Sequence, residues 1–166
     1  MSEIRIPSPS LKQTTPPMIE NLAESRGISF SEIVNGSLRI LSQRGREFAP
    51  QYAAADPFPN AAFENLFNTA YLRKVVAEFP DPNSLGWEKH HHVYSTKTTS
   101  ADYLSWGPYT QRFLDFLNSA FMLEFLENLT GIAGLVPDPY FWGGGLHCTR
   151  RGGFLGVHAD FNWHER

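Results

Sequence analysis

The chain has 166 residues, of which 42% are hydrophobic and 19% charged, and its net charge is −3. This length allows one domain with a hydrophobic core of its own. No Lys/Arg-rich run predicts a nucleic-acid-binding surface, no apolar run approaches the roughly 20 residues that span a bilayer, and the single cysteine, Cys148, excludes an intramolecular disulfide. We therefore expect a cytoplasmic protein without nucleic-acid or membrane partners.

Residues 1–50 are predicted to form a flexible leader with little regular structure. They contain several prolines and many Ser and Thr residues, but only short apolar groups. Such a composition buries too little apolar surface to order the chain, and we expect disorder in about the first 15 residues. Within the leader, residues 18–26 fit a helical turn or two, and residues 33–41 fit a short strand. The polar N-terminus lacks the apolar centre of a signal peptide.

A compact region is predicted from residue 51 onward. Between residues 61 and 79, apolar side chains recur every three to four positions, which predicts one helix with an apolar face. Asn60 is a suitable N-cap for this helix. The Pro-Asp-Pro-Asn run at residues 80–83 is expected to end it.

Three consecutive histidines, His90, His91 and His92, follow this helix and invite a metal-binding hypothesis. On a strand, consecutive side chains point to opposite faces, so the three imidazoles cannot all face one ion. A solvated loop is therefore the favoured interpretation of this run.

The helical period returns at Pro108 and predicts two helices, or one broken helix, that end at Gly131 and Gly134. The large apolar residues of this segment recur at helical spacing, and we expect them to form core rather than a cofactor site. They are Phe113, Leu114, Leu117, Phe121, Leu123, Phe125, Leu126 and Leu129.

Beyond Pro137 the sequence changes to a strand-like pattern. An aromatic run at residues 140–142 precedes a predicted strand over 146–149, a Gly-containing turn over 150–153 and a returning strand over 154–161. Two short extended segments around such a turn predict a β-hairpin. The fold class is therefore α+β, with helices first and sheet last.

His158 and Asp160 are the residues that most clearly suggest chemistry. Residues i and i+2 of a strand lie on the same face, about 6–7 Å apart, so the imidazole and the carboxylate can converge on one ion. One histidine and one carboxylate make two-thirds of the facial triad that binds non-haem Fe(II), the third ligand being a second histidine. The His-X-Asp pattern alone has low specificity, and it is the surrounding sequence that favours a metal-binding interpretation.

Residues 152–164, with the sequence Gly-Gly-Phe-Leu-Gly-Val-His-Ala-Asp-Phe-Asn-Trp-His, resemble the iron-binding segment of prolyl 4-hydroxylase-like 2-oxoglutarate/Fe(II)-dependent oxygenases. The resemblance extends over about residues 53–166. It implies that His158 and Asp160 are catalytic iron ligands and that His147 contacts the co-substrate. It also implies a double-stranded β-helix, or jelly roll, of which this chain holds the start and which is incomplete at the C-terminus.

The resemblance implies a dioxygenase reaction that uses Fe(II), 2-oxoglutarate and O2, with L-ascorbate keeping the iron reduced. One C–H bond of a peptidyl (prolyl-type) or small-molecule substrate is hydroxylated, and succinate and CO2 are the co-products. The protein's part in such chemistry is to orient the substrate and to exclude side reactions. The residues of the chain assign neither the substrate nor the oligomeric state.

The chain departs from the family pattern after Asp160. Members of the family continue to a distal histidine and then to an Arg or Lys that pairs with the co-substrate carboxylate, whereas this sequence ends at Arg166. We expect the chain to be the N-terminal portion of a longer oxygenase and to be poorly active by itself. On a continuing strand His164 would lie roughly 20 Å from His158, too far to complete the site. The remaining candidate for the third iron ligand is an upstream histidine, at position 90, 91, 92 or 147.

Two other classes of protein remain as alternatives. The first is a non-catalytic binding or assembly module in which the His-X-Asp pattern is a relic. The second is a hydrolytic zinc enzyme with an open coordination position, although a His-Glu-X-X-His helix and paired cysteines are absent from the sequence. Cys148 is interpreted as a structural thiol, because its strand neighbour His147 points to the other face.

Overall fold

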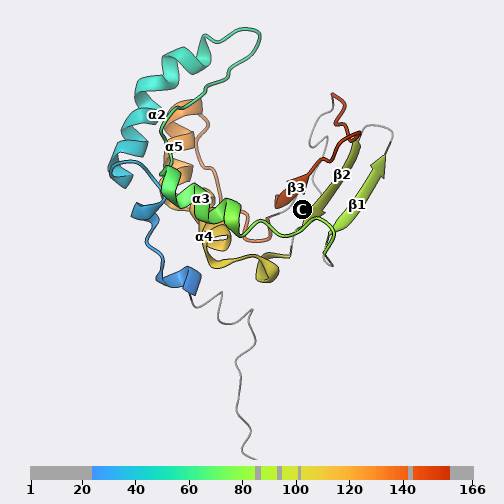
Figure 1. The fold of residues 1–166 in the computed structure, drawn as a ribbon. Coiled ribbons are helices and arrows are strands. Elements are labelled where there is room, and N and C mark those ends of the chain that lie inside the picture. Colours follow the sequence, from blue (N-terminus) through green and yellow to red (C-terminus); the bar gives the residue numbers. More distant parts are fainter. Residues whose placement is uncertain (1–23, 85–86, 93–94, 101, 142–143, 158–166) are drawn as a thin grey trace, which may run out of the picture.

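A computed structural model describes residues 24–84, 87–92, 95–100, 102–141 and 144–157 of the chain. Helices that pack together form one part of the molecule and a small antiparallel sheet forms the other, which confirms the α+β class (Figure 1). In chain order the elements are η1 (Phe30–Glu32), α2 (Leu38–Ala53), α3 (Thr69–Ala77), β1 (Glu88–His92), β2 (Ser95–Ser100), η2 (Tyr103–Ser105), α4 (Pro108–Leu117), α5 (Ala120–Thr130) and β3 (Leu146–Cys148). The predicted order, with helices first and sheet last, is wrong, because β1 and β2 precede α4 and α5 along the chain. None of the described helices is both long enough and apolar enough to cross a bilayer.

Helices α2 and α5 lie side by side and form the main helix–helix contact (Figure 1). Gly45 of α2 makes the close approach possible, because a Cβ atom there would lie only 2.6 Å from the carbonyl oxygen of Phe125. Leu41, one turn earlier, is buried in the same region of the core. A residue with any side chain at position 45 would therefore have to push the two helices apart.

Hydrogen bonds between polar side chains also join α2 to α5. The hydroxyl of Ser42 donates to Glu124 Oε1 at 2.7 Å and accepts from Asn128 Nδ2 at 3.0 Å. Arg46, one turn along α2, also donates to Ser42 Oγ, at 2.9 Å. The two bonds to Glu124 and Asn128 fix the position of α2 along α5, because each of them needs a short donor–acceptor distance.

Edge-to-face aromatic pairs fill the core between the helices. Phe116 and Phe125 are almost completely buried. The Phe116 ring meets Phe30 at a centroid distance of 5.4 Å, and the Phe125 ring meets Phe63 at 5.2 Å. Each fully buried ring of this size contributes about 1.5–3 kcal/mol through removal of apolar surface from water.

The first turn of α4 is capped by a carboxylate from another helix. Glu78, which follows α3, accepts from the backbone N–H groups of Tyr109 (3.1 Å) and Thr110 (2.8 Å) and from the Thr110 hydroxyl (2.9 Å). The unpaired N–H groups and the positive end of the helix dipole make this position favourable for an anion. Gly107 leaves the space for it, because a Cβ there would lie 2.3 Å from Glu78 Cδ.

Within the described residues, three strands form one antiparallel sheet in the order β1–β2–β3. Glu88 pairs with Thr99 at one end of the β1–β2 ladder, and Thr98 pairs with Cys148 in the β2–β3 ladder. The last residue of β2, Ser100, is buried and accepts from the indole N–H of Trp106 at 3.1 Å. This buried bond ties the end of the sheet to the segment that leads into α4.

The expectation of little regular structure before residue 50 is wrong for the described part of that segment. Residues 24–27 are helical, and α2 occupies residues 38–53, where residues 33–41 were expected to form a strand. The reason is tertiary, because α2 is stabilised by its contact with α5 and helices of this length gain most of their stability from packing. Residues 1–23 lie outside the described part.

The helix expected over residues 61–79 is shorter than predicted. It begins after Asn68, whose side chain accepts from the N–H of Ala70 at 2.9 Å, so Asn60 is not the N-cap. The preceding residues are not helical, and Phe67 forms an antiparallel bridge with Val34. This pairing satisfies backbone groups that a helix would otherwise use. The end of the helix, before residues 80–83, agrees with the prediction.

The solvated loop expected at His90–His92 is also wrong, because these residues belong to β1 and pair with β2. The predicted hairpin is wrong in its pairing. Of the described residues, β3 pairs with β2, and after the turn the carbonyl of Phe154 again accepts from β2, from Thr96 N at 2.9 Å. The two segments therefore follow the same edge of β2 in succession, and residues 158–161 of the expected returning strand lie outside the described part.

The two helices expected after Pro108 are confirmed as α4 and α5. Gly131 ends α5 in the left-handed region, at φ 74°, as its interpretation as a stop signal requires. Most of the predicted apolar residues contribute to the core, with Phe125 and Leu129 buried. Phe121 is an exception, because 43% of its surface is exposed.

Substitution of Gly45 tests the close contact between α2 and α5. We expect Gly45→Ala to lower the free energy of unfolding by up to about 2 kcal/mol, because an overpacking cost of about 1–3 kcal/mol is only partly offset by a gain of roughly 1 kcal/mol in helix propensity. Gly27→Ala is the matched control, since residue 27 is also helical and no atom lies within 4 Å of a Cβ there. Urea denaturation followed by circular dichroism measures both, and equal effects would contradict the packing argument.

Candidate functional site

His147 lies on β3 with an exposed side chain, between the half-buried residues Leu146 and Cys148. The register pairs it with Thr99 of β2. Lys97 lies two residues before Thr99 and therefore on the same face of the sheet. Its Nζ is 3.4 Å from His147 Nδ1. The sheet thus places an ammonium group beside the imidazole that the sequence singled out, and the sequence analysis did not identify Lys97.

His158 and Asp160 lie outside the described residues, so their geometry is not described. The structure describes the segment that leads to them as far as Val157. Gly152 adopts φ 85° in the turn after β3, and Gly153 is packed so closely that a Cβ would lie 2.7 Å from Thr96 O. The chain therefore lies against β2 when it leaves the turn, where the Phe154 carbonyl accepts from the N–H of Thr96. Phe154 is four residues before His158.

Among the residues that the structure describes, no group of three or more His, Cys, Asp or Glu side chains is arranged to hold a metal ion. Cys148 is a half-buried free thiol on β3, and its carbonyl oxygen accepts from the Thr98 hydroxyl at 3.3 Å.

A cavity of about 430 Å³ lies where η2, α4 and residues 137–141 meet. The sequence analysis did not predict this site. Its lining combines aromatic rings, proline rings, one amide and one carboxylate, and consists of Tyr103, Asp115, Asn118, Pro137, Pro139, Tyr140 and Phe141. Such a mixture of apolar walls with a few polar groups is typical of pockets for small molecules.

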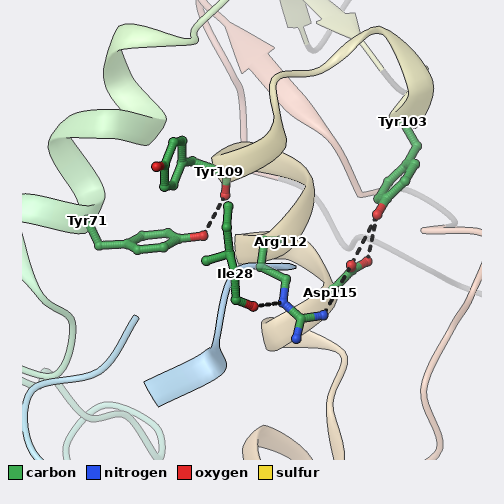
Figure 2. A network of polar contacts seen from close by, with 6 residues as sticks. All are labelled: Ile28, Tyr71, Tyr103, Tyr109, Arg112 and Asp115. Atoms are coloured by element: carbon green, nitrogen blue, oxygen red, sulfur yellow. Dashed lines mark hydrogen bonds and ion pairs between the residues drawn. The ribbon is translucent and has the colours of Figure 1, made fainter. Parts of the chain in front are cut away.

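The carboxylate of Asp115 is the charged group of this cavity. The Tyr103 hydroxyl points at it and donates to Oδ1 at 3.0 Å and Oδ2 at 3.1 Å (Figure 2). Burial raises the pKa of Tyr103 to about 12, with a further contribution from the Asp115 charge. The phenol is therefore a permanent donor at neutral pH.

Arg112 lies on the other side of Asp115, one turn earlier on α4 (Figure 2). Its Nη1 is 3.9 Å from Asp115 Oδ2, beyond hydrogen-bonding distance. Its Nε donates to the carbonyl of Ile28 at 2.7 Å, and its guanidinium group lies 3.7 Å above the Phe30 ring. Arg112 thus fastens the N-terminal segment to α4 and serves Asp115 only as a more distant charge.

The same close view shows a second, separate tyrosine contact. Tyr71 of α3 is buried, and its hydroxyl donates to the carbonyl of Tyr109 at 3.0 Å (Figure 2). Burial raises its pKa well above the ordinary value of a phenol. This bond joins α3 to α4 and has no contact with the cavity lining, so we assign it to the fold.

The loop that closes the cavity is held in place by Asn118. Its Nδ2 donates to the carbonyl of Asp138, and its Oδ1 accepts from the N–H of Asp138 at 3.0 Å. Further along the loop, Phe141 adopts φ 49°, a conformation that costs a non-glycine residue about 1–3 kcal/mol. Its ring stacks on Tyr103 at a centroid distance of 5.7 Å. The surrounding contacts therefore impose the loop shape.

No protein-family model, curated protein or solved structure matched the chain in the comparisons that were made.

The charge state of Asp115 gives a pH dependence of stability. Burial raises the pKa of this carboxyl, and Tyr103, Arg112 and Arg26 each act to lower it without cancelling the effect of burial. The folded state then holds the proton more tightly than the unfolded state. The stabilisation is complete below the unfolded pKa of about 4 and is lost as the pH rises through the folded pKa.

We therefore expect the wild type to gain stability relative to Asp115→Asn as the pH is lowered from 7 to about 4. Asn keeps an oxygen that can accept from Tyr103, so the comparison isolates the titration. Chemical denaturation at several pH values measures the difference. A difference between the two proteins that is independent of pH would show that the folded and unfolded pKa values are equal.

Proposed function

We propose that the chain carries iron ligands of a 2-oxoglutarate/Fe(II)-dependent dioxygenase, namely His158 and Asp160. The observation that carries the proposal is the run of residues 152–164, which begins with the two glycines of the turn that follows the antiparallel strand β3. The described sheet supports it, because Phe154 bonds to β2 and the chain approaches His158 from a strand edge. Strands β1, β2 and β3 would then belong to a double-stranded β-helix.

The chemistry of the two donors fits Fe(II). A neutral imidazole nitrogen and a carboxylate oxygen are the ligand types of the facial triad, which leaves coordination positions open for a co-substrate and O2. Bound Fe(II) would supply the hydroxylation of a C–H bond in a peptidyl or small-molecule substrate, with 2-oxoglutarate and O2 converted to succinate and CO2 and with ascorbate keeping the iron reduced. The residues of this chain hold the metal and orient the co-substrate, in the cytoplasm.

Lys97 and His147 extend this proposal to the co-substrate. A carboxylate of 2-oxoglutarate needs a cationic donor, and the ammonium group of Lys97 provides three donors beside an imidazole. Both residues belong to the face of the sheet where His147 is exposed. We assign the pair to binding the distal carboxylate, a role that the family resemblance gives to a basic residue elsewhere.

Metal binding is the direct test of the two ligands. We expect the wild-type chain to bind one Fe(II) under anaerobic conditions, and His158→Ala or Asp160→Ala to weaken binding at least about tenfold, since ligand number governs affinity. His164→Ala is the matched control, because its imidazole is predicted to lie too far along the strand to coordinate the same ion. Equilibrium dialysis measures the affinity.

Wild-type binding that is absent, or equal in all four proteins, would contradict the iron proposal. In that case the non-catalytic binding or assembly module is the better description. Iron binding without 2-oxoglutarate-dependent formation of succinate would retain the ligands and reject the dioxygenase activity of this chain by itself.

Lys97→Gln tests the co-substrate assignment. We expect it to weaken binding of 2-oxoglutarate to the Fe(II)-loaded chain about tenfold or more, since a charge-assisted hydrogen bond contributes about 1.5–3 kcal/mol. The affinity for Fe(II) should not change. Arg151→Gln is the control, because it removes the same charge from an exposed position in the nearby turn. Equal losses in both variants would indicate general electrostatics rather than a specific contact.

A further inference from the structure

The cavity beside Asp115 includes none of the proposed iron ligands in its lining, and its function does not depend on iron. We propose that it binds a primary ammonium group on a small apolar stem, with the ammonium donating to Asp115 and the stem lying against Tyr140, Pro137 and Pro139. The proposal concerns the chemistry that the ligand presents, whether the ammonium belongs to a free amine or to a lysine side chain.

The carboxylate of Asp115 has acceptor capacity that its neighbours do not use. An ionised carboxylate offers about four lone-pair positions. Tyr103 supplies one proton, shared between Oδ1 at 3.0 Å and Oδ2 at 3.1 Å. Because the same carboxylate lines the cavity, further donors can reach it from the cavity side.

The nearest protein cation is held at a distance. Arg112 Nη1 lies 3.9 Å from Asp115 Oδ2, and the guanidinium group is committed to Ile28 O and to the ring of Phe30. It therefore lowers the cost of an ionised Asp115 without occupying its acceptor positions. A ligand ammonium at hydrogen-bonding distance would make the closer ion pair.

The charge of the site selects a cation over other ligands. Burial acts against the ionised form of Asp115, and a positive charge in the cavity would offset this effect. A carboxylate or phosphate ligand would meet repulsion from Asp115, and a neutral ligand would add no positive charge to that of the more distant Arg112. A quaternary ammonium ion carries no N–H and could not use the free acceptor positions, which favours a primary amine.

The walls of the cavity suit a short apolar stem. A volume of about 430 Å³ lies within the range of small-molecule pockets. Tyr140 contributes an exposed ring, 74% accessible, that a ligand would cover. Asn118 fixes the loop through both of its hydrogen bonds to Asp138, so the wall requires little ordering on binding.

Benzylamine is the probe, because its ammonium group and ring match the two halves of the site. We expect a Kd of about 1 mM for so small a ligand, with shifts of the Asn118 side-chain amide in a ¹H–¹⁵N spectrum. Benzyl alcohol has nearly the same shape without the charge and should bind at least about tenfold more weakly. Nα-acetyl-lysine methylamide, as the third probe, presents the same ammonium on a peptide-like backbone.

Asp115→Asn should weaken benzylamine binding at least about tenfold, since it removes the charge and keeps the shape. Asp102→Asn is the matched control, because Asp102 is exposed, makes no cap hydrogen bond and does not line the cavity. Tyr140→Ala removes a largely exposed ring from the wall of the cavity and should weaken binding several-fold.

Binding of the lysine derivative alone, with the same dependence on Asp115, would support the site and identify a peptide lysine as its source. Equal affinities for benzylamine and benzyl alcohol, an unchanged affinity in Asp115→Asn, or no binding of either amine would overturn the proposal. None of these results depends on iron, so this test and the metal-binding test can fail separately.

Discussion

The contact of α2 with α5 at Gly45 is the constraint on which the helical part depends. Because Gly45 has no side chain, the backbone of α2 reaches the backbone of α5 near Phe125. Phe125 is thereby placed against Phe63, and this residue belongs to the non-helical segment that leads to α3. The segment in turn pairs with Val34 through Phe67. One close backbone approach therefore organises residues that are distant in the sequence.

Strong local signals in the sequence predicted the later helices correctly. The apolar period after Pro108 and the left-handed glycine at 131 are local features, and α4 and α5 follow them. Helix α2 has no such signal, because it contains Gly45 and Pro50 and depends on a partner that follows about 80 residues later. Asn60 and Asn68 are equally good caps in isolation, and only the bridge at Phe67 decides between them.

The candidate sites also differ in whether a local sequence pattern reveals them. The His-X-Asp pattern is contiguous and can be recognised from sequence. The cavity gathers Tyr103, Asp115 and Tyr140 from three separate segments, and no local pattern marks them as neighbours. Lys97 was missed for a similar reason, since only the antiparallel register brings it next to His147.

Two carboxylates of the structure illustrate how local geometry separates a structural role from the binding role that we propose. Glu78 uses both oxygens on the first turn of α4 and lies in the space that Gly107 leaves. Asp115 receives one shared proton from Tyr103 and lines an open cavity. Residue type alone does not distinguish these situations, because the difference lies in how many acceptor positions are already filled.

The return of the chain to β2 after the turn determines which face of the sheet each following side chain takes. Phe154 bonds to Thr96, and this bond fixes which residues of the following segment share a face. On a strand that continues to residue 161, as the sequence predicts, His158 and Asp160 would lie on the same face as Phe154. One residue inserted between Phe154 and His158 would preserve the His-X-Asp spacing and yet turn both ligands to the opposite face, whereas two would restore them. The number of residues between Phe154 and His158 would thus set the direction of the proposed iron ligands.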